Sequence, residues 1–115
     1  FCLLILVSCG QKPSFFTCEG IEERNILNNL TSPWNENKGL SINKKNKTLI
    51  FGTWMGEGSY EQRDNSLFST PLETPISREL IIFDTVSGEL QHHQIKEGVT
   101  TRVYVYKCKQ TEKLL

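Results

Sequence analysis

The sequence lacks an excess of charge of either sign. Thirteen Lys and Arg residues balance thirteen Asp and Glu residues, so the formal net charge at neutral pH is zero. A domain without a net positive field exerts no long-range attraction on phosphate groups or anionic lipid. Nucleic acid is therefore not an expected partner.

A long hydrophobic run is also missing. The apolar opening of the chain, residues 1–7, contains no charged side chain, but it is far shorter than the roughly 20 residues of a membrane-spanning helix. Its length is that of the apolar region of a signal peptide. A core strand is the alternative, which the polar and turn-forming residues Ser8, Gly10 and Pro13 disfavour.

The apolar opening ends in Leu6-Val7-Ser8-Cys9, which resembles the lipobox of bacterial lipoproteins. The resemblance implies cleavage after Ser8 and a diacylglycerol on the sulfur of Cys9. Several acyl chains on one residue anchor a protein stably, so the membrane becomes a partner through Cys9. In that family, an Asp directly after the lipidated cysteine retains the protein at the inner membrane. Gly10 stands at this position here, so the resemblance implies the outer membrane, with the domain facing the periplasm.

This resemblance divides the chain into three parts. No Met and no basic residue precede the apolar run, so we expect the sequence to begin inside a signal peptide that ends at residue 8. Residues 9–13 are then a lipidated tether. Residues 14–115 form one β domain, a length that suits a single modest core.

The cysteine count agrees with this location. Of the four cysteines, Cys2 leaves with the signal peptide and Cys9 takes the lipid. The remaining two, Cys18 and Cys108, predict one disulfide in an oxidising envelope, with two buried free thiols as the alternative. Neither has another Cys or a His within four residues, so we expect neither a metal site nor a cofactor.

The spacing of apolar residues predicts an all-β fold, a small single-domain antiparallel β sandwich or barrel. One expected hairpin joins strands at residues 40–42 and 48–54 through the polar connection 43–47; a second joins strands at 79–84 and 89–95 through a turn at 85–88. Gly88 suits the positive φ of the second turn.

The other segments are weaker in pattern. After a glycine-rich turn at 56–59, short strands are expected at 60–63 and 66–69, with a surface loop at Pro71 and Pro75 and a last alternating strand at 100–109. We expect Cys108 to tie this last strand to the first. Residues 21–30 fit at most one short helix or an irregular loop, and Trp34 either covers the core edge or is exposed.

Catalytic motifs are absent from the sequence. It contains no Gly-x-Ser-x-Gly elbow, no His-Glu-x-x-His pair and no phosphate-binding loop. His92-His93 suggests metal binding or acid–base chemistry, but neighbours on a strand point to opposite faces, which favours a surface or half-buried pair. Asp84 fits the turn that follows it better than a catalytic role.

Carboxylate pairs are the last candidates for chemistry. Glu22-Glu23 and Glu57 with Glu61 could serve as acid and base only across a cleft, which a sequence cannot show. We therefore expect a binding or structural module rather than an enzyme. An enzyme or small-ligand binder whose site is assembled from distant segments is the alternative.

The chain is also similar to the small lipid-anchored inhibitors of c-type lysozyme. The likeness lies in the lipobox, in Phe16-Thr17-Cys18-Glu19-Gly20 and in the late cysteine. It implies a partner that degrades the cell wall. The inhibitors carry a Ser-Gly-rich loop that ends in Tyr, whereas here Ser87-Gly88 precedes Glu89-Leu90, so no binding residue is carried over.

Overall fold

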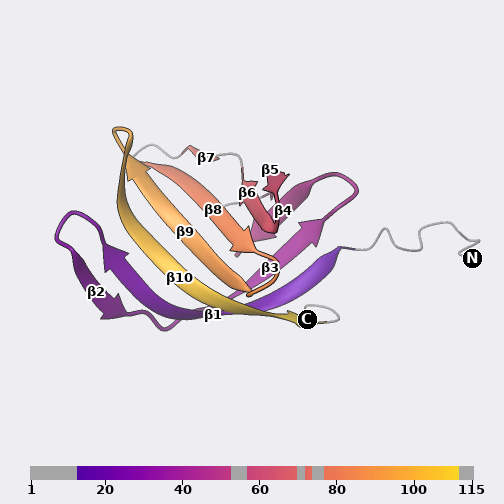
Figure 1. Ribbon diagram of the computed structural model, residues 1–115, viewed down its shortest axis with the longest axis horizontal. Coiled ribbons are helices and arrows are strands. Elements are labelled where there is room, and N and C mark those ends of the chain that lie inside the picture. Colours follow the sequence, from indigo (N-terminus) through magenta and orange to yellow (C-terminus); the bar gives the residue numbers. More distant parts are fainter. Residues whose placement is uncertain (1–12, 53–56, 70–71, 74–76, 112–115) are drawn as a thin grey trace, which may run out of the picture.

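The computed structural model describes residues 13–52, 57–69, 72–73 and 77–111, and these residues are all-β with no helix. The strands are β1 (Ser14–Asn25), β2 (Leu30–Pro33), β3 (Asn37–Asn43), β4 (Thr48–Phe51), β5 (Glu57–Arg63), β6 (Ser66–Ser69), β7 (Leu72–Glu73), β8 (Arg78–Asp84), β9 (Glu89–Lys96) and β10 (Val99–Thr111). Figure 1 shows the long strands β1, β9 and β10 running across the molecule.

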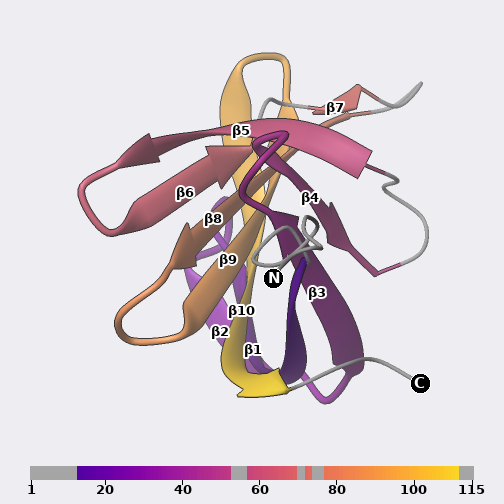
Figure 2. The same ribbon diagram turned by 90° about the vertical axis from the view of Figure 1, so that its right-hand side faces the viewer.

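Eight of the strands close into an antiparallel barrel. Each of β1, β3, β4, β5, β6, β8, β9 and β10 pairs with the next in this order, and β10 pairs with β1 to complete the ring. The view in Figure 2 looks into this ring from the end where β1 begins. A barrel of eight strands is just wide enough for side chains to fill it or to leave room for one small ligand.

The core lies inside the barrel, because alternate residues of each strand point inward. Its largest fully buried side chains include Leu40 on β3, Phe51 on β4, Ile81 and Phe83 on β8, and Tyr106 on β10. Outward-facing Val103 and Val105 of β10 are buried as well, although they are not part of this central cluster.

A bulge at Gly20 divides β1 into two parts. Before it, β1 pairs with β3; after it, β1 pairs with β2 through Asn25 opposite Leu30, while β10 continues along its other side. Residues 21–30 thus form a β-hairpin, where the sequence suggested a short helix or irregular loop. The bulge turns the strand out of the barrel, so the hairpin extends beyond the closed ring.

Gly20 is required at this bend because two backbones meet there. Its N–H donates to the Glu36 carbonyl at 2.6 Å, and a Cβ at this position would lie 2.7 Å from Cδ1 of Trp34. The absence of a side chain lets the segment between β2 and β3 lie directly on β1.

The two predicted hairpins are confirmed. Asn43 pairs with Thr48 across the first connection, and Phe83 pairs with Leu90 across the second, where Gly88 has a φ of +80°. The turn expected at 56–59 is wrong for residues 57–59, which belong to β5, and residue 56 lies outside the described residues. Trp54, Pro71 and Pro75 lie outside the described residues.

Residues 1–12, which include Cys9, the expected signal segment and most of the expected tether, lie outside the described residues too. Within the described ranges, no helix is long and apolar enough to cross a membrane.

Candidate functional site

The predicted disulfide between Cys18 and Cys108 is present. The two residues are directly opposite each other in the β1–β10 pairing, with Cα atoms 3.9 Å apart, and both are buried in the core. The bridge therefore fastens the first strand to the last at the place where the barrel closes.

The centre of the barrel holds a buried polar pair, Glu79 of β8 and His92 of β9. His92 Nε2 lies 2.5 Å from Glu79 Oε1, and both side chains are almost completely shielded from solvent. Burial lowers the pKa of His92, and the hydrogen bond with Glu79 opposes that shift. The expectation of a surface or half-buried histidine is thus wrong for His92, although His92 and His93 do point to opposite faces.

The arrangement of this pair does not match a hydrolytic triad. Ser77 donates to Glu79 Oε2, so the carboxylate lies between the serine and the histidine. In a Ser–His–acid triad the imidazole lies between the other two, because it must take the proton from the serine. The buried contacts instead satisfy three polar groups that would be costly to leave without partners.

An aromatic lid covers the histidine on one side. Trp34 packs against Tyr104 with ring centroids 4.8 Å apart, and its Nε1 donates to the hydroxyl of Tyr106 at 3.1 Å. The Tyr106 hydroxyl in turn donates to Glu36 Oε1, which also lies 3.3 Å from Nζ of Lys38. Trp34 therefore covers the core edge, as one of the two sequence predictions had it.

A small cavity of about 190 Å³ remains under this lid, lined in part by Trp34, Glu36, His92 and Tyr104. Burial raises the pKa of Tyr106 well above that of a free tyrosine, so the hydroxyl stays protonated and holds its place in the network. Trp34, Tyr106, Glu36 and Lys38 at this cavity already engage one another, and His92 engages Glu79. The network is therefore better suited to holding the lid than to binding a ligand.

The remaining candidate residues do not converge. Asp84 Oδ1 accepts hydrogen bonds from the backbone N–H groups of Val86 and Ser87, which confirms its turn role and lowers its pKa. His93 is half-buried on the outer face, where its Nε2 lies 2.9 Å from Oε1 of Gln91. Glu89 is exposed and accepts a hydrogen bond from Gln91.

The carboxylate pairs are likewise dispersed. Glu22 pairs with Arg24, Glu23 with Arg102, and Glu61 with Arg63. The side chain of Glu57 lies outside what the structure describes. Across the described part of the chain, no group of three or more His, Cys, Asp or Glu side chains is placed to hold a metal ion.

The most unusual surface lies at the hairpin end of the molecule, which we define by Ile26, Leu27, Leu30 and Val99. Their exposed fractions are 47%, 69%, 62% and 53%. Leu27 and Val99 line one open groove of about 510 Å³ together with Lys96, Glu97 and Thr101, and the Ile26 N–H donates to the Thr101 carbonyl. The turn of the β1–β2 hairpin thus lies next to β10 at Thr101, on the same side of the molecule as the β9–β10 turn (Figure 1).

Sequence reasoning missed this surface. Ile26, Leu27 and Leu30 fall in the segment where the sequence predicts at most a short helix or an irregular loop, and Val99 precedes the predicted last strand. The signal available was weak, since exposed apolar residues cannot be told from core residues until the bulge at Gly20 is known.

Comparison with known proteins finds no family model, no curated protein and no solved structure that matches this chain. Its function therefore has to be inferred from the residues themselves.

Proposed function

We propose that this protein is a lipid-anchored envelope protein that acts as a binding or structural module and docks a protein partner at its hairpin end. The single observation that carries the proposal is the group of exposed apolar side chains at that end. Contiguous exposed apolar residues are a feature of interaction surfaces, and single ones are not.

The surroundings of the hairpin end have the composition of an interface. The apolar residues are flanked by Lys96 and Glu97, which are of opposite charge and give a polar rim around an apolar centre. Among the described strands, β2 pairs only with β1, so its outer edge is available to an extended segment of a partner.

The lipid anchor rests on the lipobox and on Cys9. The β domain starts at Ser14, so a chain of five residues connects it to the proposed lipid and reaches roughly 17 Å when extended. Such a short tether holds the domain beside the outer membrane and limits its partners to proteins of the envelope.

The proposal is tested with a photo-crosslinking amino acid at Leu27, introduced into the full chain in cells. Val86 is the matched control, because it is an apolar residue with an exposed fraction of 75% on the β8–β9 turn at the other end of the barrel. Crosslinks to one envelope protein from Leu27 and not from Val86 are expected. Their loss when Leu30→Asp and Val99→Asp are added to the chain that carries the crosslinker at position 27, at unchanged unfolding free energy, completes the test.

Equal crosslinking from Leu27 and Val86, or crosslinks that survive both Asp substitutions, would contradict the docking surface. Substitutions at such exposed positions ordinarily change the unfolding free energy by no more than about 0.5 kcal/mol, so a lost crosslink is not a folding effect.

A role similar to the lysozyme inhibitors is a second candidate, supported by the sequence likeness at Phe16-Thr17-Cys18-Glu19-Gly20. Inhibition of a c-type lysozyme by the purified chain would support it. The enzyme alternative has a separate test: turnover of peptidoglycan, ester or phosphate substrates that disappears in Asp84→Asn or His93→Ala would return those residues to a catalytic role.

A further inference from the structure

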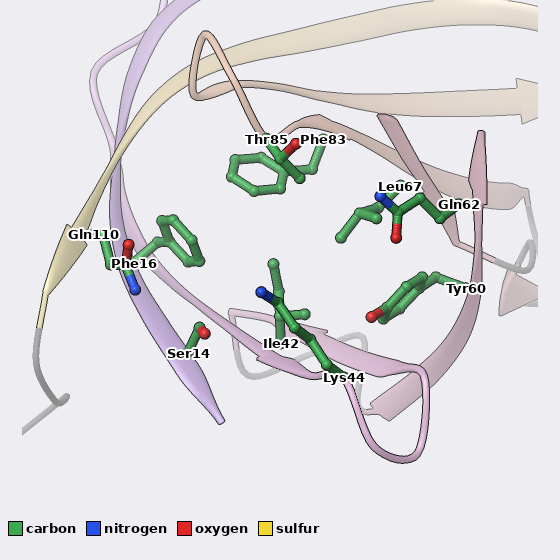
Figure 3. A pocket seen from close by; sticks show the side chains of 10 residues that line it. All are labelled: Ser14, Phe16, Ile42, Lys44, Tyr60, Gln62, Leu67, Phe83, Thr85 and Gln110. Atoms are coloured by element: carbon green, nitrogen blue, oxygen red, sulfur yellow. The ribbon is translucent and has the colours of Figure 1, made fainter. Parts of the chain in front are cut away.

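A second cavity opens at the end of the barrel where β1 begins, opposite the hairpin end. We call it the mouth. Its volume is about 290 Å³, and Figure 3 shows its side chains arranged around an empty centre. Its lining residues come from β1, β3, β5, β6, β8 and β10 and from two adjoining turns, so it is one end of the barrel interior and not a groove on the outside.

The inner wall of the mouth is apolar. Ile42, Leu67 and Phe83 line it and belong to the buried core cluster. Phe16 completes the wall and packs edge-on against Phe83, with ring centroids 5.1 Å apart. An apolar group that enters the mouth therefore leaves water for a surface that is already formed.

The rim of the mouth is polar, and most of its polar side chains have no hydrogen-bond or ion-pair partner within the described part of the chain. Ser14, Lys44, Tyr60 and Gln110 line it, and none of these side chains has a hydrogen-bond or ion-pair partner among the residues that the structure describes. In Figure 3 the amine of Lys44 extends over the cavity, and the Tyr60 hydroxyl points toward its centre.

The charge of the mouth has one sign. Lys44 is the only ionisable residue other than Tyr60 among the described side chains that line it, and no Asp or Glu is present there. Burial raises the pKa of Tyr60, so its hydroxyl is a neutral donor at physiological pH. The rim thus presents one cation and one phenolic donor above an apolar wall.

We propose that the mouth binds a small amphipathic carboxylate, a medium-chain fatty acid of about eight to ten carbons. The cavity has room for roughly ten groups the size of a water molecule, at about 30 Å³ each, and a methylene group is of similar size. A single cation balances the single charge of a carboxylate better than the charge of nearly two on a phosphate monoester. The chain enters the apolar wall, and the carboxylate accepts hydrogen bonds from Lys44 and Tyr60.

The test uses the full chain with Cys9→Ser, which cannot take a lipid and is handled without detergent. Sodium decanoate is titrated in and binding is followed by amide chemical shifts. We expect saturable one-to-one binding that moves resonances of residues on the mouth, and binding of decan-1-ol at least tenfold weaker. This outcome does not depend on lipidation or on a partner at the hairpin end.

Variants separate charge recognition from folding. Lys44→Gln is expected to weaken decanoate binding about tenfold, and Tyr60→Phe, which keeps the ring, several-fold. Lys45→Gln is the matched control, because Lys45 is exposed on the same turn and does not line the cavity. The absence of saturable binding overturns the proposal. Equal affinity for decanoate and decan-1-ol, or an equal effect of Lys44→Gln and Lys45→Gln, overturns it as well.

Discussion

Gly88 lies where the β8–β9 turn touches the last strand. Its φ is +80°, and a Cβ at this position would lie 2.6 Å from the carbonyl oxygen of Cys108. The Gly88 carbonyl accepts a hydrogen bond from the Cys108 N–H at 2.7 Å, so the turn cannot easily move away. We expect Gly88→Val to lower the unfolding free energy by roughly 1 to 3 kcal/mol, measured by urea unfolding.

Gly98 is the control for this prediction. It has nearly the same φ, +78°, but no atom lies within 4 Å of where its Cβ would be. Gly98→Val therefore carries the backbone strain without the contact. If the two variants lose equal stability, the contact with Cys108 contributes nothing.

The buried histidine makes stability depend on pH. Burial lowers the pKa of His92 in the folded state, despite the opposing hydrogen bond from Glu79, and Lys38 lowers it further while Glu36 raises it. Between the folded pKa and the ordinary value near 6.5, the unfolded chain binds more protons. The contribution of His92 to the unfolding free energy is therefore expected to be fully present above about pH 7. It falls as the pH drops below about 6.5, by at most about 1.4 kcal/mol per pH unit for one proton.

The measurement is urea unfolding at several pH values between about 5 and 8. The pKa of His93 is also lowered by burial, with the charge of His92 as a smaller cause, so His93→Gln is the control that isolates the central pair. His92→Gln should lower stability throughout and flatten the pH dependence. An unchanged slope in His92→Gln would show that another group is responsible.

The inward position of this pair was only partly predictable. The turn at residues 85–88 sets Phe83 opposite Leu90, which places His92 opposite Ile81. Strand β8 is apolar on both faces, with Leu80 and Ile82 on one and Ile81 and Phe83 on the other. The sequence thus gives the register but not which face is the interior, because that depends on how the barrel closes.

At the scale of elements, the disulfide joins the two strands that close the ring. Cys18 and Cys108 are separated by 90 positions, so the bridge removes a large loop-closure entropy from the unfolded chain. The chain-entropy relation gives about 4 to 5 kcal/mol for a loop of this length. We expect Cys18→Ala with Cys108→Ala to lose stability of this order, measured by urea unfolding and compared with the wild type under oxidising and reducing conditions.

A loss below about 1 kcal/mol would show that the β1–β10 pairing holds without its bridge. If the wild type in reductant and the double variant differ, the substitutions themselves disturb the core. Agreement between them assigns the loss to the bond.

The hairpins and the disulfide could be predicted from sequence because each depends on neighbouring residues or on a count of cysteines. The β1–β2 hairpin could not. Its apolar residues, Ile26, Leu27 and Leu30, have neither the period of a strand nor that of a helix. The direction of the hairpin is set by the contact between Gly20 and Glu36, which are distant in sequence. The sequence could not decide between a sandwich and a barrel for the same reason, because the answer depends on whether the distant strands β10 and β1 pair.

At the scale of the whole molecule, the two proposed binding surfaces lie at opposite ends of β1. Ser14 lines the mouth and Asn25 leads into the hairpin turn, and the 12 residues of this strand extend roughly 35 Å. Figure 1 shows this separation along the length of the molecule. A lipid on Cys9 would hold the mouth near the membrane, where fatty acids arise, and leave the hairpin end directed into the periplasm.

This arrangement depends on lipidation at Cys9, which is the last prediction. The chain is expressed behind a complete signal start, and cells are labelled with a clickable fatty-acid analogue. We expect label on the wild type and none on Cys9→Ser, because the thioether forms only on that sulfur. Cys2→Ser is the control: it alters a cysteine on the other side of the cleavage position, so its label should equal that of the wild type. Equal labelling of Cys9→Ser and the wild type would refute the lipid anchor. Which of the two surfaces lies nearer the membrane would then be undetermined. Binding of decanoate at the mouth would be unaffected.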